Sequence, residues 1–157
     1  MQIKLIAVGK TDHNALQTLI DDYTKRLAHY IKFEYTIIPD IKNAKNLSES
    51  QQKQKEGELI LAKTKSSDYL ILLDEKGKAF DSVAFSKYLQ KHLNSGVKQV
   101  TFVIGGPYGF SDKLYQRANA KISLSNMTFS HQMVRLFFIE QLYRGFSILK
   151  NEPYHHQ

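Results

Sequence analysis

The segment FVIGGPYG, residues 102–109, joins a short apolar run to a turn that contains three glycines. An apolar run of this length that ends at glycine is typical of a buried strand. Glycine has no Cβ, so the main chain of the turn can approach a bound ligand closely. The turn lacks the spacing of a P-loop and of the G-x-G-x-x-G motif. The glycines alone do not distinguish a ligand-binding loop from an ordinary turn.

Strand-like and helix-like segments alternate on both sides of this turn. Short apolar runs predict strands at 3–8, 33–38, 69–73, 100–104 and 121–124. Helical spacing and N-cap residues predict helices at 14–30, 48–65, 81–93, 111–119 and 131–149. This order predicts a single α/β domain over residues 1–157, with a mainly parallel sheet and helices on both faces. Ligands bind beyond the carboxyl ends of such strands, which here are Gly9, Asp74, Gly105 and the segment 124–129.

The composition limits the classes of protein to which the chain can belong. It has 157 residues and no cysteine, which excludes disulfides, zinc-thiolate sites and thiol catalysis. The formal net charge of +7 favours a polyanionic partner such as a nucleic acid, although a charge count carries no geometry. No apolar run approaches the roughly 20 residues that cross a bilayer, and the N-terminal run is too short for a secretory signal. We therefore expect a cytoplasmic protein without a membrane partner.

The last predicted helix and the segment before it contain unusual residues. Residues 125–129, SNMTF, form a longer connection than a turn needs. Such a loop can offer hydrogen bonds and an apolar wall to an adenine ring, or simply cap the core. The helix is apolar around most of its circumference, which predicts burial on two sides. It nevertheless contains Arg135, Glu140 and Arg144, which indicate an interface or a site or, in the simpler case, one surface ion pair between the last two.

The C-terminal tail contains Pro153-Tyr154-His155-His156. Its tyrosine and histidines can donate or accept hydrogen bonds, and histidine exchanges protons near neutral pH. Adjacent histidines can also bind a metal, but no third or fourth ligand lies nearby in the sequence. We therefore predict no metal site.

These segments together resemble one known family. The stretches concerned are IAVGK at 6–10, LLD at 72–74, FVIGGPYG at 102–109, LSNMTFSHQMVR at 124–135, IEQLYRGFSI at 139–148 and PYHH at 153–156. They resemble ribosomal RNA large subunit methyltransferase H, a family of SPOUT-class enzymes that methylate N3 of a pseudouridine in 23S ribosomal RNA. The resemblance covers essentially the whole chain. It departs at His156, where other members have arginine or lysine, and at Ser130, where the family usually has proline; serine is a good N-cap, so we expect it to begin the last helix.

The resemblance implies a fold and a methyl donor. SPOUT enzymes thread the C-terminal segment through a loop to form a trefoil knot, a topology that is otherwise very rare. The knot loops bind S-adenosylmethionine in a bent shape. Residue by residue, the resemblance assigns the donor pocket to Leu73, Gly105, Leu124, Ser125, Asn126, Met127, Thr128 and Phe129.

The resemblance also implies partners and a chemistry. The family works as a homodimer in which the tail of one subunit completes the site of the other. Its substrate is 23S ribosomal RNA, in the large subunit or the 70S ribosome. N3 must lose its proton, so His155 is the expected base, with Tyr154 orienting it or stacking on the nucleobase. Arg135 and Arg144 are expected to stabilise the developing anion or to bind phosphate. Contacts with RNA are expected from His131, Arg144 and His156.

Three other functions stay open. A catalytically inactive ribosome-binding or assembly factor on the same scaffold would bind RNA without the donor. A flavodoxin-like nucleotide or phosphate binder would need a phosphate loop after the first strand, and Gly9-Lys10-Thr11-Asp12 is a poor one. A transfer RNA methyltransferase of the same class would differ only in its substrate.

Overall fold

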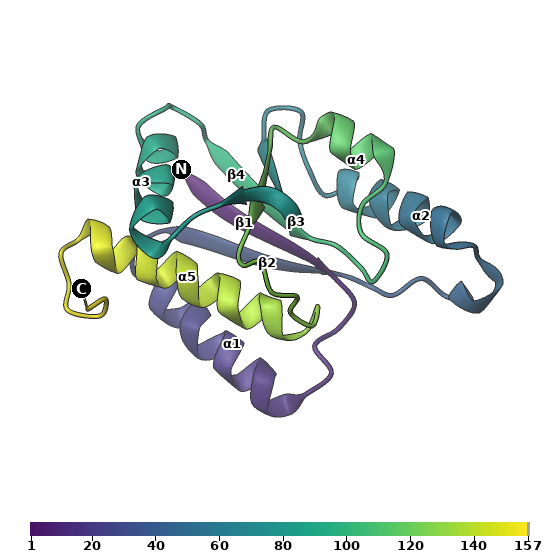
Figure 1. Cartoon of the computed structure of the whole chain (residues 1–157), viewed down its shortest axis with the longest axis horizontal. Coiled ribbons are helices and arrows are strands. Elements are labelled where there is room, and N and C mark those ends of the chain that lie inside the picture. The colour runs from purple at the N-terminus through teal and green to yellow at the C-terminus, as the bar shows by residue number, and fades with distance from the viewer. Residues whose placement is uncertain (157) are drawn as a thin grey trace.

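The computed structural model describes residues 1–156 and shows alternating strands and helices (Figure 1). The strands are β1 (Gln2–Val8), β2 (Lys32–Ile38), β3 (Tyr69–Ala79), β4 (Gln99–Ile104) and β5 (Ala120–Ser123). The helices are α1 (Asn14–Leu27), α2 (Glu49–Leu61), α3 (Ser82–Leu93), α4 (Asp112–Arg117) and α5 (Met133–Leu149), with a short 3₁₀ turn η1 (Ala44–Asn46). The predicted order of elements is confirmed.

The five strands within residues 1–156 form one sheet in the order β2-β1-β4-β3-β5, and each neighbouring pair is parallel. Helices α1, α3 and α5 pack together on one face, whereas α2 and α4 cover the other (Figure 1). The prediction of a parallel sheet with helices on both faces is therefore confirmed. Because the strands are parallel, their carboxyl ends lie along one edge of the sheet, where ligands bind in folds of this kind.

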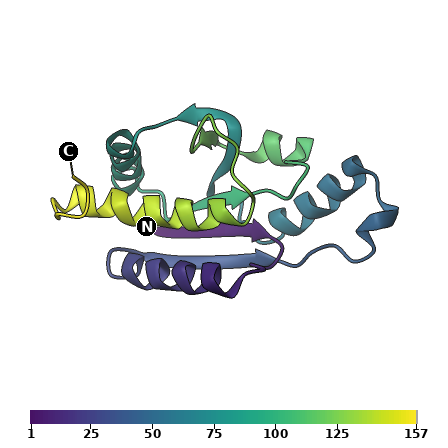
Figure 2. The same ribbon diagram turned by 60° about the horizontal axis from the view of Figure 1, so that its bottom comes forward.

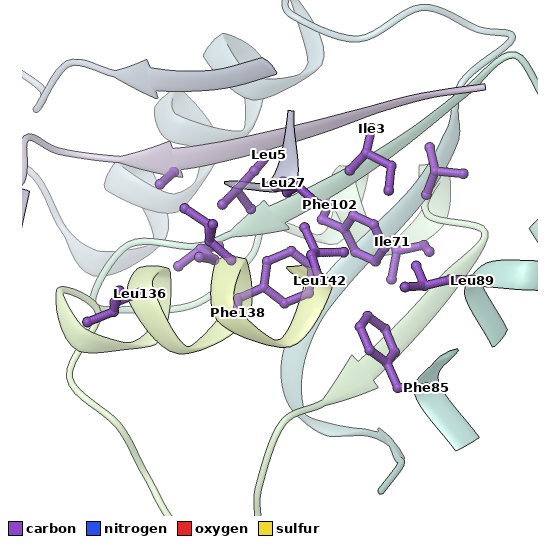
Figure 3. Packing of buried hydrophobic residues seen from close by; sticks show 14 of the residues in the cluster. Ile3, Leu5, Leu27, Ile71, Phe85, Leu89, Phe102, Leu136, Phe138 and Leu142 are labelled. Carbon is purple, nitrogen blue, oxygen red and sulfur yellow. The ribbon is translucent and has the colours of Figure 1, made fainter. Parts of the chain in front are cut away.

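Two apolar clusters hold these layers together. The larger lies between the sheet and α1, α3 and α5, where the rings of Phe102 and Phe138 meet at a centroid distance of 4.8 Å (Figure 3). The smaller lies beneath α2 and α4. Successive residues of β1 alternate between them: Ile3 and Leu5 face the first and Ile6 faces the second. This period of two explains why β1, which is covered on both faces, is apolar and buried at every position from Leu5 to Val8.

Strand β3 is longer than the sequence indicated. We predicted a strand that ends at Leu73, because the polar segment 74–77 has the character of a turn. That prediction is wrong: β3 continues to Ala79, and its pairing with β5 shifts register after Leu73. Gly77 permits the continuation, because a Cβ at this position would lie 2.5 Å from the backbone of Ile122. The close approach of two strands therefore overrides a turn-like composition.

The predicted starts of α1 to α4 are confirmed to within one residue, and α5 begins at Met133, two residues after its predicted start. Several predicted ends lie a few residues too far along the chain. Ser48 and Gln51 form the expected capping box before α2. The side chains of Asp81 and Ser111 cap α3 and α4. The helices predicted to reach residues 30, 65 and 119 end at Leu27, Leu61 and Arg117. An N-cap is a specific side-chain contact, but these C-termini have no comparable sequence signal.

The segment between β5 and α5 returns from the edge of the sheet to the middle of one face. Strand β5 lies at the edge beside β3, while α5 packs against both α1 and α3 (Figure 2). This route is consistent with the trefoil knot that the resemblance implies. Among residues 1–156, no helix is long and apolar enough to cross a membrane.

His92 of α3 is a buried titratable group. It is 6% exposed and lies between the rings of Tyr69 and Tyr88, at centroid distances of 4.5 and 4.6 Å. Its Nε2 atom has no hydrogen-bond partner among the described residues. Burial, with a smaller contribution from Lys91, lowers the pKa of His92. The folded protein therefore keeps this imidazole neutral at pH values where the unfolded chain takes up a proton.

We expect the free energy of unfolding to fall as the pH drops below about 6.5, the ordinary pKa of histidine. The cause is that the unfolded state then binds one more proton than the folded state. Urea unfolding at pH 7.5 and pH 5.5 measures the change. His92→Phe keeps an aromatic ring and should flatten the dependence; an equal slope in both proteins would contradict the assignment.

Candidate functional site: a cavity at the strand ends and a C-terminal tail

A cavity of about 610 Å³ opens at the carboxyl ends of β3, β4 and β5. Residues 73–76, 104–110, 122–125 and 127–129 supply most of its wall. These segments are distant in sequence and meet because neighbouring parallel strands end at the same edge. The volume lies within the roughly 300–1,000 Å³ of small-molecule sites.

Most of the residues that the resemblance assigns to the donor pocket line this cavity. They are Leu73, Gly105, Leu124, Ser125, Met127, Thr128 and Phe129. Asn126 is not among the lining residues. His131, which we predicted as an RNA contact, also lies at the cavity wall and is exposed. The predicted donor residues are thus brought together with one predicted RNA residue.

The glycine loop after β4 forms a tight turn at the cavity. The Gly109 N–H donates to the Gly106 carbonyl at 3.2 Å. Gly109 has a φ of +83°, a backbone conformation that favours glycine. A Cβ on Gly105 would lie 3.0 Å from the Phe110 ring. At Gly105 and Gly106 the cavity wall is therefore main chain.

The connection between β5 and α5 presents apolar side chains at the cavity. The Ser123 hydroxyl donates to the Ser125 carbonyl at 3.0 Å, and the Ser125 hydroxyl accepts from the Met127 N–H at 2.9 Å. Met127 is 78% exposed. Phe129 packs on Phe137 of α5 with ring centroids 5.1 Å apart. Met127 and Phe129 thus give the cavity an accessible apolar surface of the kind that receives an aromatic ligand.

Asp74 and Tyr115 add a polar contact to the cavity wall. The Tyr115 hydroxyl donates to Asp74 Oδ2, and the Lys76 N–H donates to Oδ1 at 2.8 Å. Burial and the hydrogen bond to Asp74 raise the pKa of Tyr115 to about 12. The sequence identified Asp74 as the end of a strand, but nothing in it indicated a partner 41 positions away.

The N-cap position of α5 is occupied by Gln132, which makes no side-chain cap hydrogen bond, so the prediction that Ser130 is the N-cap is wrong. Ser130 lies in the turn just before the helix and binds its first main-chain donors. Its hydroxyl accepts from the Met133 N–H at 3.0 Å, and its carbonyl accepts from the Val134 N–H at 3.0 Å. These bonds satisfy main-chain donors that are otherwise unpaired in the first turn of a helix. Serine in place of the usual proline therefore retains a defined helix start.

Arg135 is completely buried and is not part of the cavity wall. Its guanidinium donates to the carbonyl oxygens of Val8 and Gly9, at 2.7 Å each, and to that of His131 at 2.9 Å. These bonds join the end of β1 to the start of α5. The geometry gives Arg135 a positioning role rather than contact with a nucleobase.

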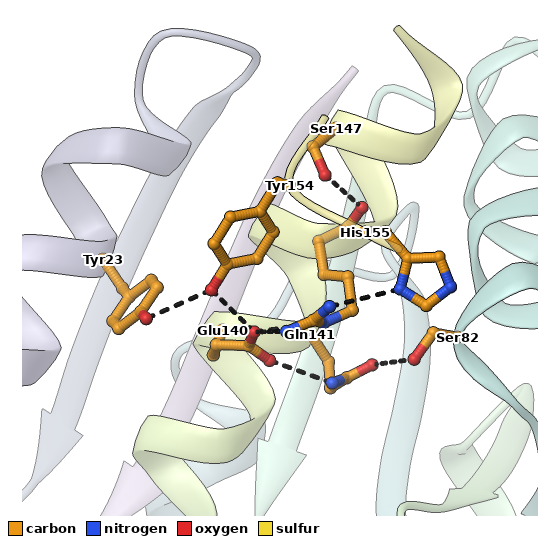
Figure 4. Close-up of polar contacts among 8 residues, drawn as sticks. Tyr23, Ser82, Glu140, Gln141, Ser147, Tyr154 and His155 are labelled. Carbon is orange, nitrogen blue, oxygen red and sulfur yellow. Dashed lines mark hydrogen bonds and ion pairs between the residues drawn. The ribbon is translucent and has the colours of Figure 1, made fainter. Parts of the chain in front are cut away.

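The C-terminal tail folds back onto α5 (Figure 4). Glu140 and Arg144 form the predicted ion pair at 2.6 Å. The Tyr154 hydroxyl donates to Glu140 Oε1 at 2.9 Å, and Arg144 donates to His155 Nδ1 at 3.2 Å. His156 is exposed. Three of the predicted residues, Arg144, Tyr154 and His155, thus share one network.

The ring of Tyr154 is enclosed by aromatic and cationic neighbours. It meets Tyr143 edge-on at a centroid distance of 4.6 Å, and Arg144 Cζ lies 4.7 Å from its centroid. Its hydroxyl lies 3.1 Å from that of Tyr23 in α1. Burial raises the pKa of Tyr154, and hydrogen bonds with Tyr23 and Glu140 raise it further. Tyr154 is therefore a neutral hydrogen-bonding group near pH 7.

The tail network and the cavity lie near different ends of α5. Val134 lines the cavity, whereas Arg144 binds the tail. The ten positions between them correspond to about 15 Å along a helix. In Figure 1 the C-terminus lies beyond the end of α5 that is remote from β5. A single chain therefore does not bring Tyr154 and His155 to its own cavity.

Comparison with known proteins agrees with the resemblance along the chain. The profile of a family described as "Predicted SPOUT methyltransferase" matches residues 1–155. Proteins named ribosomal RNA large subunit methyltransferase H from Flavobacterium johnsoniae and Flavobacterium psychrophilum are each 74% identical over 157 residues, and the one from Christiangramia forsetii is 65% identical. Each comparison covers 100% of this chain and 100% of the relative. The chain belongs to the SPOUT methyltransferase family, in the group of ribosomal RNA large subunit methyltransferase H.

Proposed function

We propose that this protein transfers a methyl group from S-adenosylmethionine to N3 of a pseudouridine in 23S ribosomal RNA. The cavity at the strand ends carries the proposal, because most of the residues assigned to the donor converge there. The name of the relatives, ribosomal RNA large subunit methyltransferase H, supports the RNA substrate. The net charge of +7 favours the same polyanionic partner. The proposal includes a cytoplasmic location, because the ribosome is there.

The residues of the cavity fit the donor. The bare main chain at Gly105 and Gly106 permits close approach of a polar ligand. Met127 and Phe129 offer apolar surface to an adenine ring, and the Asp74 carboxylate accepts hydrogen bonds from hydroxyl or ammonium groups. S-adenosylmethionine supplies an electrophilic methyl group on a sulfonium, so the part of the protein is chiefly positioning. Residues 1–156 contain no group of three or more acidic or histidine side chains placed to hold a metal ion.

A second subunit completes the site in this proposal. The tail of one chain lies remote from its own cavity, so we propose a homodimer in which each tail serves the cavity of its partner. Exposed apolar side chains beside the cavity support such an interface: Met133 is 41% exposed and Phe137 is 39% exposed.

His155 is the proposed base, and its hydrogen bond with Arg144 must break before it can accept a proton through Nδ1. Arginine has no acceptor, so Arg144 donates to His155 Nδ1 and that nitrogen bears no proton. In the neutral ring the proton then lies on Nε2, which has no partner among residues 1–156. His155 accepts a proton from N3 through Nδ1 once Arg144 turns away from it. A backbone phosphate that binds Arg144 would release Nδ1 at the moment when RNA arrives.

The other polar groups act on the RNA in this proposal. The neutral hydroxyl of Tyr154, held by Glu140, orients the target base or the imidazole. His131 at the cavity wall and the exposed His156 are placed to contact the nucleotides around it.

A methylation assay on free 23S ribosomal RNA, large subunits and 70S ribosomes tests the function. We expect N3-methylpseudouridine to form only with protein and S-adenosylmethionine together, and most readily on assembled particles, because one small domain has little surface with which to select a nucleotide. Calorimetry with the donor excludes or supports a non-catalytic assembly factor, which would bind RNA and leave the donor free. Methylation of transfer RNA in place of these substrates would contradict the proposal.

A further inference from the structure

Glu56 of α2 is a buried acid, and one of its two carboxylate oxygens lacks a hydrogen-bond partner in the described part of the chain. It is 4% exposed, and its Oε1 atom has no hydrogen-bond partner among residues 1–156. Asp68 is equally buried, yet it accepts from the Lys65 N–H and from the side-chain amide of Gln99. A buried carboxylate oxygen that is left unpaired costs free energy, so a role beyond the fold is the natural explanation for Glu56.

The carboxyl group of Glu56 lies against the glycine loop. A Cβ on Gly106 would be 2.4 Å from Oε2 and 2.7 Å from Oε1. Gly106 lines the donor cavity, whereas Glu56 does not. The acid therefore occupies the space behind the loop that a side chain at residue 106 would otherwise fill.

The surroundings of Glu56 favour an uncharged carboxyl group. Burial raises the pKa of Glu56, a hydrogen bond with Gln52 opposes this effect in part, and the charge of Asp40, in the segment after β2, adds to it. Asp40 itself lies against the end of β1, where a Cβ on Gly9 would be 2.8 Å from its Oδ1. A protonated carboxyl group packs against the main chain of Gly106 at a lower desolvation cost than a carboxylate.

We propose that Glu56 is a positioning residue for the methyl donor: its carboxyl end supports Gly106 from behind and fixes the main-chain groups that Gly105 and Gly106 present to the cavity. The inference rests on the proposed function of that cavity. It gives α2, on the face of the sheet opposite α5, a part in donor binding. The contact depends on shape rather than charge, so an amide of the same size serves as well as the acid.

Substitutions at the two positions test the contact as a pair. Gly106→Ala places a methyl group where the Glu56 carboxyl lies, so we expect the dissociation constant for S-adenosylmethionine, measured by calorimetry, to rise on the order of tenfold. Glu56→Ala alone raises it severalfold, and Glu56→Gln leaves it unchanged. The double variant Gly106→Ala/Glu56→Ala recovers most of the loss caused by Gly106→Ala, a non-additive result. A double variant no better than Gly106→Ala, or a Gln variant as weak as the Ala variant, overturns the inference.

Steady-state kinetics separate positioning from a role in the chemical step. In Glu56→Ala, KM for the donor rises while kcat at saturating donor keeps its parent value. Glu58→Ala, which removes an exposed acid from the same helix, is the matched control and changes neither quantity. A fall in kcat at an unchanged KM contradicts the positioning role. If the parent protein binds no donor, the proposed function fails, while the same pair of substitutions compared by thermal unfolding still tests the contact between Glu56 and Gly106.

Discussion

Arg135→Leu lowers the free energy of unfolding by about 3–5 kcal/mol. Arg135 has no exposed surface, and its guanidinium donates to the carbonyl oxygens of Val8 and Gly9 at the end of β1. Leucine fills part of the volume but leaves these buried oxygens without a donor, and an unsatisfied buried acceptor is costly. The substitution also removes the hydrogen bonds that join β1 to the first turn of α5.

Chemical unfolding followed by circular dichroism measures this loss. Arg135→Lys keeps one charged donor group and should lose less stability. Arg26→Leu, which removes an exposed arginine from α1, is the control and should change the free energy far less. If Arg135→Leu keeps its stability and yet loses methyl transfer, Arg135 acts on the substrate, as the sequence first suggested, and the positioning role is wrong.

Removal of residues 153–157 lowers methyl transfer by about 100-fold or more and leaves donor binding unchanged. Tyr154 and His155 are the groups proposed to handle the target base, whereas the cavity that receives the donor lies near the other end of α5. The methyl-transfer rates of the single variants His155→Ala and Tyr154→Phe show how much of the loss is due to each side chain. Full turnover of His155→Ala at saturating substrate would remove His155 as the base.

Mixed dimers show which cavity each tail serves. One subunit lacks the tail, and the other carries Thr128→Trp, which fills the cavity with an indole ring. Each variant alone is inactive, but an equal mixture recovers about a quarter of the parent activity, because half of the dimers are mixed and each of these has one complete site. Activity that does not return after subunit exchange would mean that the tail acts within its own subunit.

The order of the elements and the starts of the helices follow from short stretches of sequence. Apolar runs such as 3–8 and 100–104 predicted buried strands, and Ser48, Asp81 and Ser111 predicted helix starts that the structure confirms. Each of these features depends on residues within about four positions of one another, so it can be predicted from a short stretch of sequence. The parallel sheet follows in turn from the alternation of strands and helices.

The candidate donor cavity was predicted from two sources. The rule that ligands bind at strand ends indicated Gly105 and the segment 124–129, and the resemblance to a family added Leu73 and the chemistry of the donor. The same edge of the sheet also carries Asp74, but its bond to Tyr115 was not predictable. A strand end can be located from periodicity, whereas the side chain that meets it comes from another element.

Contacts between distant segments depend on the tertiary structure. Arg135 resembled a site residue because a charge in an apolar helix is unusual, yet its partners Val8 and Gly9 lie 127 and 126 positions away. Glu56 is one acid in a polar stretch until the fold sets it against Gly106. The sequence also showed that the tail contains side chains able to exchange protons. It did not show that the tail lies far from its own cavity, because that distance is set by the position of α5 in the fold. Contacts between residues more than a hundred positions apart depend on how the whole chain folds. Local patterns of residues predict helices and strands but not such contacts.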